Sequence, residues 1–290
     1  MSIFGGQGYG GRGFGGNRGR LGCGTLLGVA IILFGVIRYY GSTEKNPTTG
    51  EPQRVALSVD QERALGLQAA PQMARQMGGV VDPGDPETQT VKRIGQYLVA
   101  HSVASKSPYQ YDFHLLRDPE TVNAFALPGG QIFITRGLLH KLSDEAELAG
   151  VLGHEIGHVV QRHSAQQMAK SQLGQSIVSG VGAAASDQGQ GMSAVVIGQV
   201  IEQTVQKSYG RDHERESDEF GLRILTEAGF DPRAMIDVMR VLAESSKGGG
   251  RPPEFLITHP YPENRIKLIE QWLSEHPNEL SKLTRGRKLR

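Results

Sequence analysis

The sequence predicts a mainly helical α+β protein with a small sheet, preceded by a single membrane-spanning helix. Apolar residues recur at helical spacing in several long segments, whereas residues 131 to 135 are rich in β-branched and aromatic residues. Residues 21 to 40 carry only one charged side chain, and residues 26 to 37 are strongly apolar. The 290-residue chain has a formal net charge of +1, so its overall charge does not indicate a strongly acidic or basic partner.

The N-terminal 40 residues divide into two parts. Residues 1 to 20 consist mainly of glycine together with arginine, phenylalanine, tyrosine and asparagine, a composition that cannot form a core and therefore predicts disorder. Arginine-glycine runs can contact RNA, but the near-neutral charge of the chain argues against nucleic acid as a partner. Residues 21 to 40 have the length of one lipid-bilayer span, roughly 17–20 residues. The span ends in Ile37-Arg38-Tyr39-Tyr40, without the small residues of a cleavage site, which predicts an uncleaved anchor.

A polar linker and one large domain are expected after the span. Residues 41 to 56 include Pro47 and Gly50, which favour a linker. The domain is expected over residues 57 to 278, and it begins with two helical patterns separated by a proline-rich break. Residues 279 to 290 are a basic tail that is expected to be solvated. Within the domain, Pro128-Gly129-Gly130 precedes residues 131 to 135, which predicts a hairpin or an edge strand there.

The segment His154-Glu155-Ile156-Gly157-His158 carries the clearest chemical signal. It lies on a predicted helix with an acidic first turn and apolar residues at helical spacing. Positions i and i+4 project from one face about 5–6 Å apart, so His154 and His158 can bind one metal ion. Glu155 lies about 100° further round the helix and can reach a water on that metal as a general base. Imidazole and carboxylate ligands favour zinc.

Two histidines do not complete a catalytic zinc site, which needs three protein ligands and one water. Glu214 and Asp218 lie at positions i and i+4 of a polar helix start and therefore share a face. One of them can bind the metal while the other accepts the second N–H of a ligand histidine. A solvated acidic helix face is the alternative. The single cysteine, Cys23, excludes an intramolecular disulfide and a multi-cysteine metal site.

These motifs, with residues 123 to 130 (Asn-Ala-Phe-Ala-Leu-Pro-Gly-Gly) upstream, resemble the M48 family of gluzincin metallopeptidases, which includes membrane and periplasmic protein-quality-control proteases. The resemblance extends from about residue 85 to residue 275. It implies a zincin-like domain with the small sheet beside the motif helix, and one Zn²⁺ per chain. It also implies that Glu214 is the third metal ligand. Asp218 is then the carboxylate that accepts the second N–H of a ligand histidine. Ser217 stands where the family usually has alanine, and its hydroxyl must find a partner.

The resemblance also implies roles for residues on either side of the motif. Family proteins align an extended peptide along a strand beside the zinc, and that role maps to Asn123, Ala124, Phe125 and Ala126. An ordinary core strand is the alternative. His259 lies in a proline-rich loop, and a similar loop in the family lies near the metal. We expect His259 either to stabilise the oxyanion of the tetrahedral intermediate or to occupy the open zinc position in a resting state.

Two parts of the chain allow less direct interpretations. The remaining histidines are not expected to be metal ligands. His163, for example, follows His158 by five residues, about 140° further round a continuous helix, and so cannot join the same metal-binding face. Residues 165 to 207 are rich in small and polar residues, with two apolar patches that are each too short to cross a bilayer. They form either two helices packed on the core, or a lid or membrane-facing hairpin that regulates access.

Together these predictions indicate a membrane-anchored zinc metalloendopeptidase with Glu155 as general base and with unfolded or membrane-associated polypeptides as substrates. The positive charges that flank the span favour a single pass through the cell membrane with the catalytic domain on the periplasmic side. Two alternatives come from other classes. One is a zinc-containing, chaperone-like module that holds unfolded chains with little or no cleavage, and the other is an RNA-associated membrane protein. No sequence pattern specifies an oligomeric state.

Overall fold

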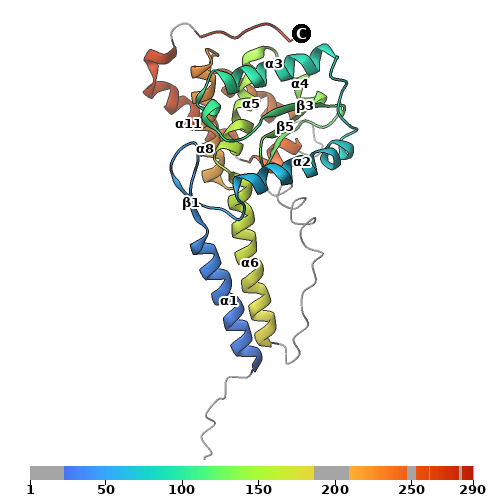
Figure 1. Cartoon of the computed structure of the whole chain (residues 1–290). Helices are drawn as coiled ribbons and strands as arrows, with labels where there is room; N and C mark the ends of the chain where they lie inside the picture. The colour runs from blue at the N-terminus through green and yellow to red at the C-terminus, as the bar shows by residue number, and fades with distance from the viewer. Residues whose placement is uncertain (1–22, 186–208, 247–252, 261, 281–282, 290) are drawn as a thin grey trace, which may run out of the picture.

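The computed structural model describes residues 23–185, 209–246, 253–260, 262–280 and 283–289 (Figure 1). These residues form a helical domain around a small sheet, and two long helices extend from it side by side (Figure 1). The prediction of a mainly helical α+β fold with one N-terminal apolar helix is confirmed. The interpretations of residues 1 to 20 and of the apolar patch at residues 194 to 201 lie outside the described residues.

The element order places the sheet strands between two groups of helices. The strands are β1 (Thr43–Lys45), β2 (Pro52–Arg54), β3 (Asp112–Leu116), β4 (Ala124–Leu127) and β5 (Gln131–Thr135). The helices are α1 (Cys23–Gly41), α2 (Val59–Gln76), α3 (Pro86–Ala100), α4 (Arg136–Leu139), α5 (Glu145–Val160), α6 (His163–Ala185), α8 (Arg211–Glu227), α9 (Ala234–Ser245), α10 (Glu254–Thr258) and α11 (Pro262–Glu275), with short 3-10 turns at η1 (Val103–Lys106) and η2 (Pro277–Leu280).

Three strands form the main sheet in the order β3-β5-β4, with β5 parallel to β3 and antiparallel to β4. Gly129 and Gly130 connect β4 to β5 with positive φ angles of 84° and 105°, a region of backbone space that glycine adopts readily. The hairpin predicted at residues 131 to 135 is therefore present. β5, however, is the central strand and β4 is at the edge, because β5 also pairs with β3 from earlier in the chain.

The two faces of this sheet pack against different helices, since alternate side chains of a strand point to opposite faces. One face contributes to the main core with α3, α5, α8 and α9 through Phe113, Leu115, Ile132 and Ile134. The other face forms a smaller cluster with α2 through Leu116, Phe125, Leu127 and Phe133. The motif helix α5 is thereby held between the sheet and α8 and α9.

The segment expected to be a linker, residues 41 to 56, contains a short hairpin that contacts the domain. β1 and β2 pair in antiparallel register. The Asn46 side-chain amide donates to the carbonyl oxygen of Val160 at 2.7 Å, and the Gln53 amide donates to that of Gln161 at 2.9 Å. These buried or half-buried hydrogen bonds join the hairpin that follows α1 to the C-terminal end of α5.

The long helices α1 and α6 lie side by side and project from the domain (Figure 1). Within the described ranges, α1 is the one helix that is long and apolar enough to cross a membrane. α6 is a single helix of 23 residues, and its main packing partner is α1. The first half of the segment at residues 165 to 207 is therefore not packed mainly on the domain core.

Residues 283–289, within the stretch expected to be a solvated tail, lie across the N-terminal end of α5. The Arg285 guanidinium contacts three carboxylates at 2.9 to 3.0 Å, those of Asp144, Glu147 and Asp237. Backbone hydrogen bonds also join this segment to the start of α5. The physical reason is charge complementarity, because the first turn of α5 is acidic and partly buried.

Candidate metal centre and active site

The motif helix α5 is buried along its whole length, and α8 approaches it very closely. Asp144 caps α5, and its carboxylate accepts the N–H of Glu147 at 3.1 Å. A Cβ atom on Gly157 would lie 2.8 Å from the carbonyl oxygen of Ser217, so glycine permits the close approach of the two helices. The Ser217 hydroxyl donates to the carbonyl oxygen of His154 at 2.7 Å, and the extra hydroxyl thus has a partner.

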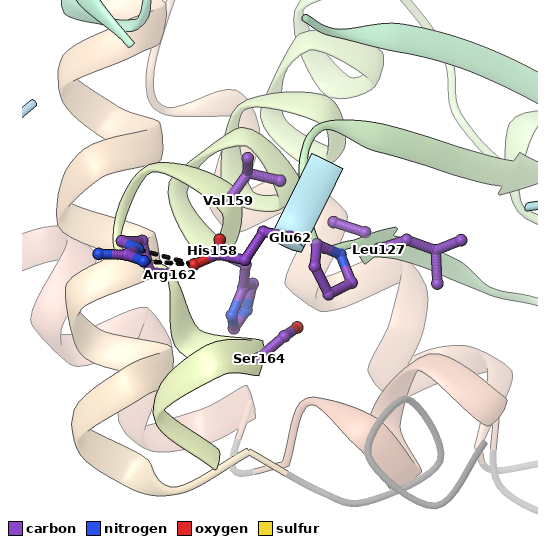
Figure 2. Close-up of a pocket in the computed structure, with 8 residues that line it drawn as sticks. Glu62, Leu127, His158, Val159, Arg162 and Ser164 are labelled. Atoms are coloured by element: carbon purple, nitrogen blue, oxygen red, sulfur yellow. Dashed lines mark hydrogen bonds and ion pairs between the residues drawn. The ribbon is translucent and has the colours of Figure 1, made fainter. Parts of the chain in front are cut away.

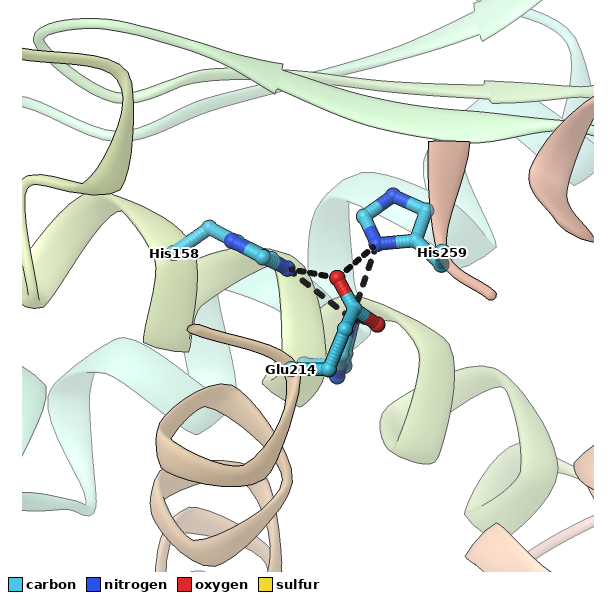
Figure 3. A group of neighbouring side chains, drawn as sticks. His158, Glu214 and His259 are labelled. Carbon is cyan, nitrogen blue, oxygen red and sulfur yellow. Dashed lines mark hydrogen bonds and ion pairs between the residues drawn. The ribbon is translucent and has the colours of Figure 1, made fainter. Parts of the chain in front are cut away.

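Four side chains from three elements converge beneath the sheet, as Figure 3 shows for three of them. His154 and His158 come from α5, Glu214 comes from α8, and His259 follows α10. The Nε2 atom of His154 lies 3.0 Å from Nε2 of His158 and 3.2 Å from Nδ1 of His259. Glu214 Oε1 lies 3.0 Å from His259 Nδ1 and 3.6 Å from His158 Nε2. All four ligand atoms lie within 4.8 Å of one another.

This donor set fits a metal ion. Ligand atoms about 2.1 Å from the centre of a tetrahedron lie about 3.4 Å apart, close to the separations observed here. Glu214 Oε2 is buried and forms an ion pair with Arg265 at 2.9 Å, but it has no hydrogen-bond partner in the described part of the chain. Burial lowers the pKa of His154 to about 4 and the pKa of His158 well below its usual value. Both rings are therefore neutral near pH 7, the form that binds metals.

The Asp218 carboxylate contacts the His154 ring on the side away from the cluster. Its Oδ1 atom lies 2.9 Å from His154 Nδ1, which leaves Nε2 directed at the cluster. Arg265 of α11 binds both oxygens of Asp218, at 2.6 and 2.7 Å. Burial alone would raise the pKa of Asp218, but Arg265 and His154 outweigh it, and the pKa lies below its usual value. Arg265 was not predicted, because its partners are far away in sequence.

His163 is not among the four clustered side chains, but it contacts one of them, His158, because it does not continue the same helix as expected. α5 ends at Val160, and Arg162 adopts a left-handed φ of 57°, so His163 starts a new helix. Its Nδ1 atom lies 2.9 Å from Nδ1 of His158, and its Nε2 atom lies 3.2 Å from a Glu216 carboxylate oxygen. One placement of the protons satisfies both contacts. His158 donates from Nδ1 to Nδ1 of His163, and His163 donates from Nε2 to the Glu216 carboxylate.

Glu155 lies beside this cluster and beneath the edge strand β4. It is 1% exposed, and burial together with Glu214 raises its pKa to about 7, against the opposing effects of His259 and Arg265. A backbone hydrogen bond from Ala126 of β4 reaches its carboxylate. At neutral pH the carboxyl group is therefore close to its midpoint, a value suited to accepting and returning a proton.

Of the residues predicted to bind substrate, Ala124, Phe125 and Ala126 belong to this edge strand and Asn123 directly precedes it. Their side chains point to different sides. The N–H of Thr135 donates to the carbonyl oxygen of Asn123 at 3.0 Å. By the alternation of an antiparallel ladder, the main-chain groups of Ala124 and Ala126 then point to the outer edge. Phe125 instead packs on the opposite face of the sheet, where it stacks on Phe133 at 4.9 Å.

His259 lies inside the cluster and not at the surface. It is 1% exposed and stacks on Phe255 at 4.4 Å between ring centroids. Its Nε2 atom lies 3.6 Å from Glu155 Oε1. Burial alone would lower the pKa of His259, but the carboxylates of Glu214 and Glu155 outweigh it and raise the pKa above its usual value. His259 is thus placed among the ligand atoms themselves.

A small pocket borders His158 on the side of α2 (Figure 2). Arg162 and Glu62 form an ion pair at one end of it, with 2.6 Å between Nη2 and Oε1. The turn after β4 forms the opposite wall. The cluster of His154, His158, Glu214 and His259 therefore lies next to the junction between α5 and α6, where α6 begins.

Replacement of His163 by phenylalanine is expected to weaken divalent-metal binding by about 10–100-fold, because His158 loses the acceptor that orients its ring. The affinity of the purified full chain for Co²⁺ can be followed by visible absorption. His163→Gln, which retains an acceptor, should recover part of the loss, and His101→Phe at an exposed position should bind like the wild type. Unchanged Co²⁺ affinity in His163→Phe would contradict this role.

A buried carboxylate beside a His-His-Glu cluster on a helical scaffold can activate water at a bound metal, and this arrangement defines the metallopeptidase class. The model of peptidase family M48 matches residues 85–273 of the chain. The chain therefore belongs to peptidase family M48, and it is a metalloendopeptidase by class.

Individual relatives agree with this assignment. The chain is 34% identical over 232 residues to the β-barrel assembly-enhancing protease of Yersinia pestis, covering 76% of this chain and 45% of that protein. It is 33% identical over 231 residues to the protein of the same name from Escherichia coli (strain K12), covering 78% and 46%. It is also 31% identical over 247 residues to the mitochondrial metalloendopeptidase OMA1 of Schizosaccharomyces pombe, covering 85% and 71%. The chain thus spans about half the length of the bacterial relatives.

Proposed function

We propose that this protein is a zinc-dependent endopeptidase, held at the cell membrane by residues 21 to 40, that cleaves unfolded or membrane-associated polypeptides on the periplasmic side. The observation that carries the proposal is the convergence of His154, His158 and Glu214 beside the buried carboxylate of Glu155. Imidazole and carboxylate donors favour zinc over magnesium or calcium, which prefer oxygen ligands alone. The names of the relatives, a β-barrel assembly-enhancing protease and a mitochondrial metalloendopeptidase, support the peptidase activity.

The proposed reaction is hydrolysis of an amide bond. When bound, zinc supplies a Lewis acid that lowers the pKa of water and stabilises negative charge on a carbonyl oxygen. Glu155 accepts the proton of the attacking water and returns it to the leaving amine, a role that suits its pKa of about 7. Asp218 and His163 hold the two ligand histidines in the orientation that directs Nε2 at the metal.

We propose that the outer edge of β4 binds the substrate main chain. The main-chain groups of Ala124 and the carbonyl oxygen of Ala126 can pair with an extended peptide, whereas the Ala126 N–H donates to Glu155. Pairing of this kind recognises the peptide backbone with little dependence on side chains. Asn123 has a buried side-chain oxygen without a hydrogen-bond partner among the described residues, and it can accept a substrate N–H. Phe125 has an indirect part in this arrangement, because its main-chain groups face β5 and its side chain packs on the opposite face of the sheet, which holds the edge strand in place.

His259 is proposed to close the site by occupying the fourth position around the metal. Its distances of 3.2 Å to His154 Nε2 and 3.0 Å to Glu214 Oε1 match those between ligands. We expect His259→Ala to bind metal more weakly and to cleave an unfolded protein several-fold faster, since the position for water is vacated. Initial cleavage rates and Co²⁺ affinity measure the two effects. A fall in cleavage rate of about 10²–10³-fold would instead favour the oxyanion role.

Removal of the metal provides the direct test of the proposed function. The full chain in detergent is incubated with a reduced, alkylated and therefore unfolded protein, with and without a chelator. We expect cleavage into peptides, loss of cleavage after chelation, and recovery when one equivalent of Zn²⁺ is restored. Metal analysis of the purified protein accompanies the assay.

The chaperone-like alternative predicts a different outcome of the same experiment. A module that only holds unfolded chains would prevent their aggregation, and no new peptides would form whether or not zinc is present. Peptides that appear only in the zinc-loaded sample would exclude it. The buried Glu155 favours the enzyme, because a binding module has no need for a carboxylate with a raised pKa at this position.

A further inference from the structure

The long helix α6 connects the metal cluster to the region where α1 is proposed to cross the membrane. It begins at His163, which contacts the ligand His158, and it ends next to the first turns of α1 (Figure 1). Its first residues are buried in the domain, whereas Ile177, Val178 and Val181 are 42%, 73% and 58% exposed. An exposed apolar helix face of this kind is costly in water.

Two close approaches establish how α6 lies along α1. A Cβ atom on Gly35 would clash with the Ser176 side chain, and one on Gly180 would lie 2.6 Å from the carbonyl oxygen of Gly28. These two contacts give an antiparallel register in which the helices approach through glycine and serine. Close backbone approach through small residues is characteristic of helix pairs within membranes. The Ser176 hydroxyl donates to the carbonyl oxygen of Gln172 at 2.9 Å, so that it has a partner without water.

The charges of the two helices agree with a common membrane boundary. Residues 171–186 contain no charged side chain, and Arg38 is the only charged residue of α1. The register brings Arg38 level with about residue 173, roughly one turn from the exposed Lys170. Both cations therefore lie at the domain end of the helix pair. Beyond them, the exposed side of α1 is apolar as well, through Leu26, Leu27, Val29, Leu33, Phe34 and Ile37.

We propose that residues 173–185 of α6 are embedded in the lipid bilayer beside α1, with acyl chains covering Val178 and Val181. This inference rests on the proposed membrane anchor. Thirteen helical residues measure about 20 Å, so this part of α6 enters the bilayer without crossing its hydrocarbon core of about 30 Å. Lipid is favoured over a second copy of the chain, because the exposed apolar surface includes both helices and is not confined to one patch.

The proposal has a consequence for the substrate. Lys170 is only seven positions after His163 in α6, so the cluster of proposed metal ligands would lie about 10 Å from the membrane boundary. α6 is one continuous helix over this stretch, and the hairpin β1–β2 connects α1 to the end of α5. The active site is thus fixed close to the bilayer surface, and it would favour segments of polypeptide that leave the membrane.

Site-specific spin labels on the full chain test the insertion. In a Cys23→Ser background, single cysteines replace Val178 on α6, Phe34 on α1 and Leu67 on α2, which is 62% exposed on the domain. The labelled proteins are reconstituted into vesicles of phosphatidylcholine and phosphatidylglycerol. Collision rates with oxygen, which concentrates in lipid, are then compared with those of a water-soluble nickel chelate. Val181→Cys provides a second label on the same face of α6.

We expect the ratio of oxygen to nickel accessibility at residues 178 and 181 to be several-fold higher than at residue 67 and similar to that at residue 34. A lipid-like ratio at residue 34 with a water-like ratio at residues 178 and 181 would overturn the insertion of α6 and leave the anchor intact. Water-like ratios at all four positions would overturn the anchor too. Labels at 178 and 181 that are shielded from both reagents would indicate contact between copies of the chain and would also overturn the proposal.

Discussion

Glu155→Gln is expected to reduce peptide hydrolysis by about 10²–10⁴-fold, the usual contribution of a general base, while the metal stays bound. Glutamine has nearly the same shape as glutamate, and its side-chain oxygen can still accept the N–H of Ala126. It cannot accept the proton of an attacking water. The three proposed ligands His154, His158 and Glu214 remain unchanged, so metal content measured by mass spectrometry should equal that of the wild type.

A ligand variant provides the matched control for this prediction. His154→Ala removes one of the converging nitrogen atoms and is expected to lose both the metal and the activity. The two variants therefore separate loss of chemistry from loss of the metal. Cleavage of the unfolded protein by Glu155→Gln at the wild-type rate would refute the role of Glu155 as general base.

Local geometry was enough to predict which side chains share a helix face, whereas the roles of His259 and of residues 123 to 126 were proposed only from the resemblance to the family. His154, Glu155 and His158 lie on one helix, and Glu214 and Asp218 lie on another, so helical periodicity alone predicts which side chains share a face. The same reasoning misplaced His163. Its position depends on the left-handed backbone of Arg162, where the sequence has neither glycine nor proline to indicate that the helix ends.

Other features depend on contacts between distant parts of the chain, which no local pattern encodes. Arg265 belongs to an ordinary amphipathic helix, and its importance follows only from its distance to Asp218. β5 could be predicted as a strand, but its central position depends on pairing with β3. Similarly, Arg285 looks like part of a solvated basic tail until the acidic start of α5 is placed beside it.

Arg162→Ala is expected to destabilise the protein by about 3–5 kcal/mol, the usual cost of removing one partner of a buried ion pair. The Arg162 side chain is 1% exposed and its Nη2 atom lies 2.6 Å from Glu62 Oε1 (Figure 2). The same nitrogen donates to the carbonyl oxygen of Leu57 at 2.7 Å. In the variant, Glu62 stays buried without its cation. Thermal unfolding of the full chain in detergent should show a midpoint lowered by roughly 10 °C.

The size of this effect should depend on pH. Burial is the main cause that raises the pKa of Glu62 above its ordinary value of 4.5, against the opposing effects of Tyr109 and Arg162. Removal of Arg162 raises it further. A carboxyl group with a raised pKa in the folded state stabilises the protein below its unfolded pKa, and this contribution is lost as the pH rises. The difference between wild type and variant should therefore be smallest below about pH 4.5 and should widen towards neutral pH.

Three further variants separate the charge from the backbone. Arg215→Ala removes an exposed partner of Glu219, and it is expected to cost less than about 1 kcal/mol. Arg162→Met combined with Glu62→Leu removes both buried charges and should be more stable than Arg162→Ala. Arg162→Gly loses the same side chain but relieves the left-handed backbone, so it should recover about 1 kcal/mol relative to Arg162→Ala. If the double variant were as unstable as Arg162→Ala, shape at the α5–α6 junction would matter more than charge, and Arg162 would hold His163 against His158 mainly by packing.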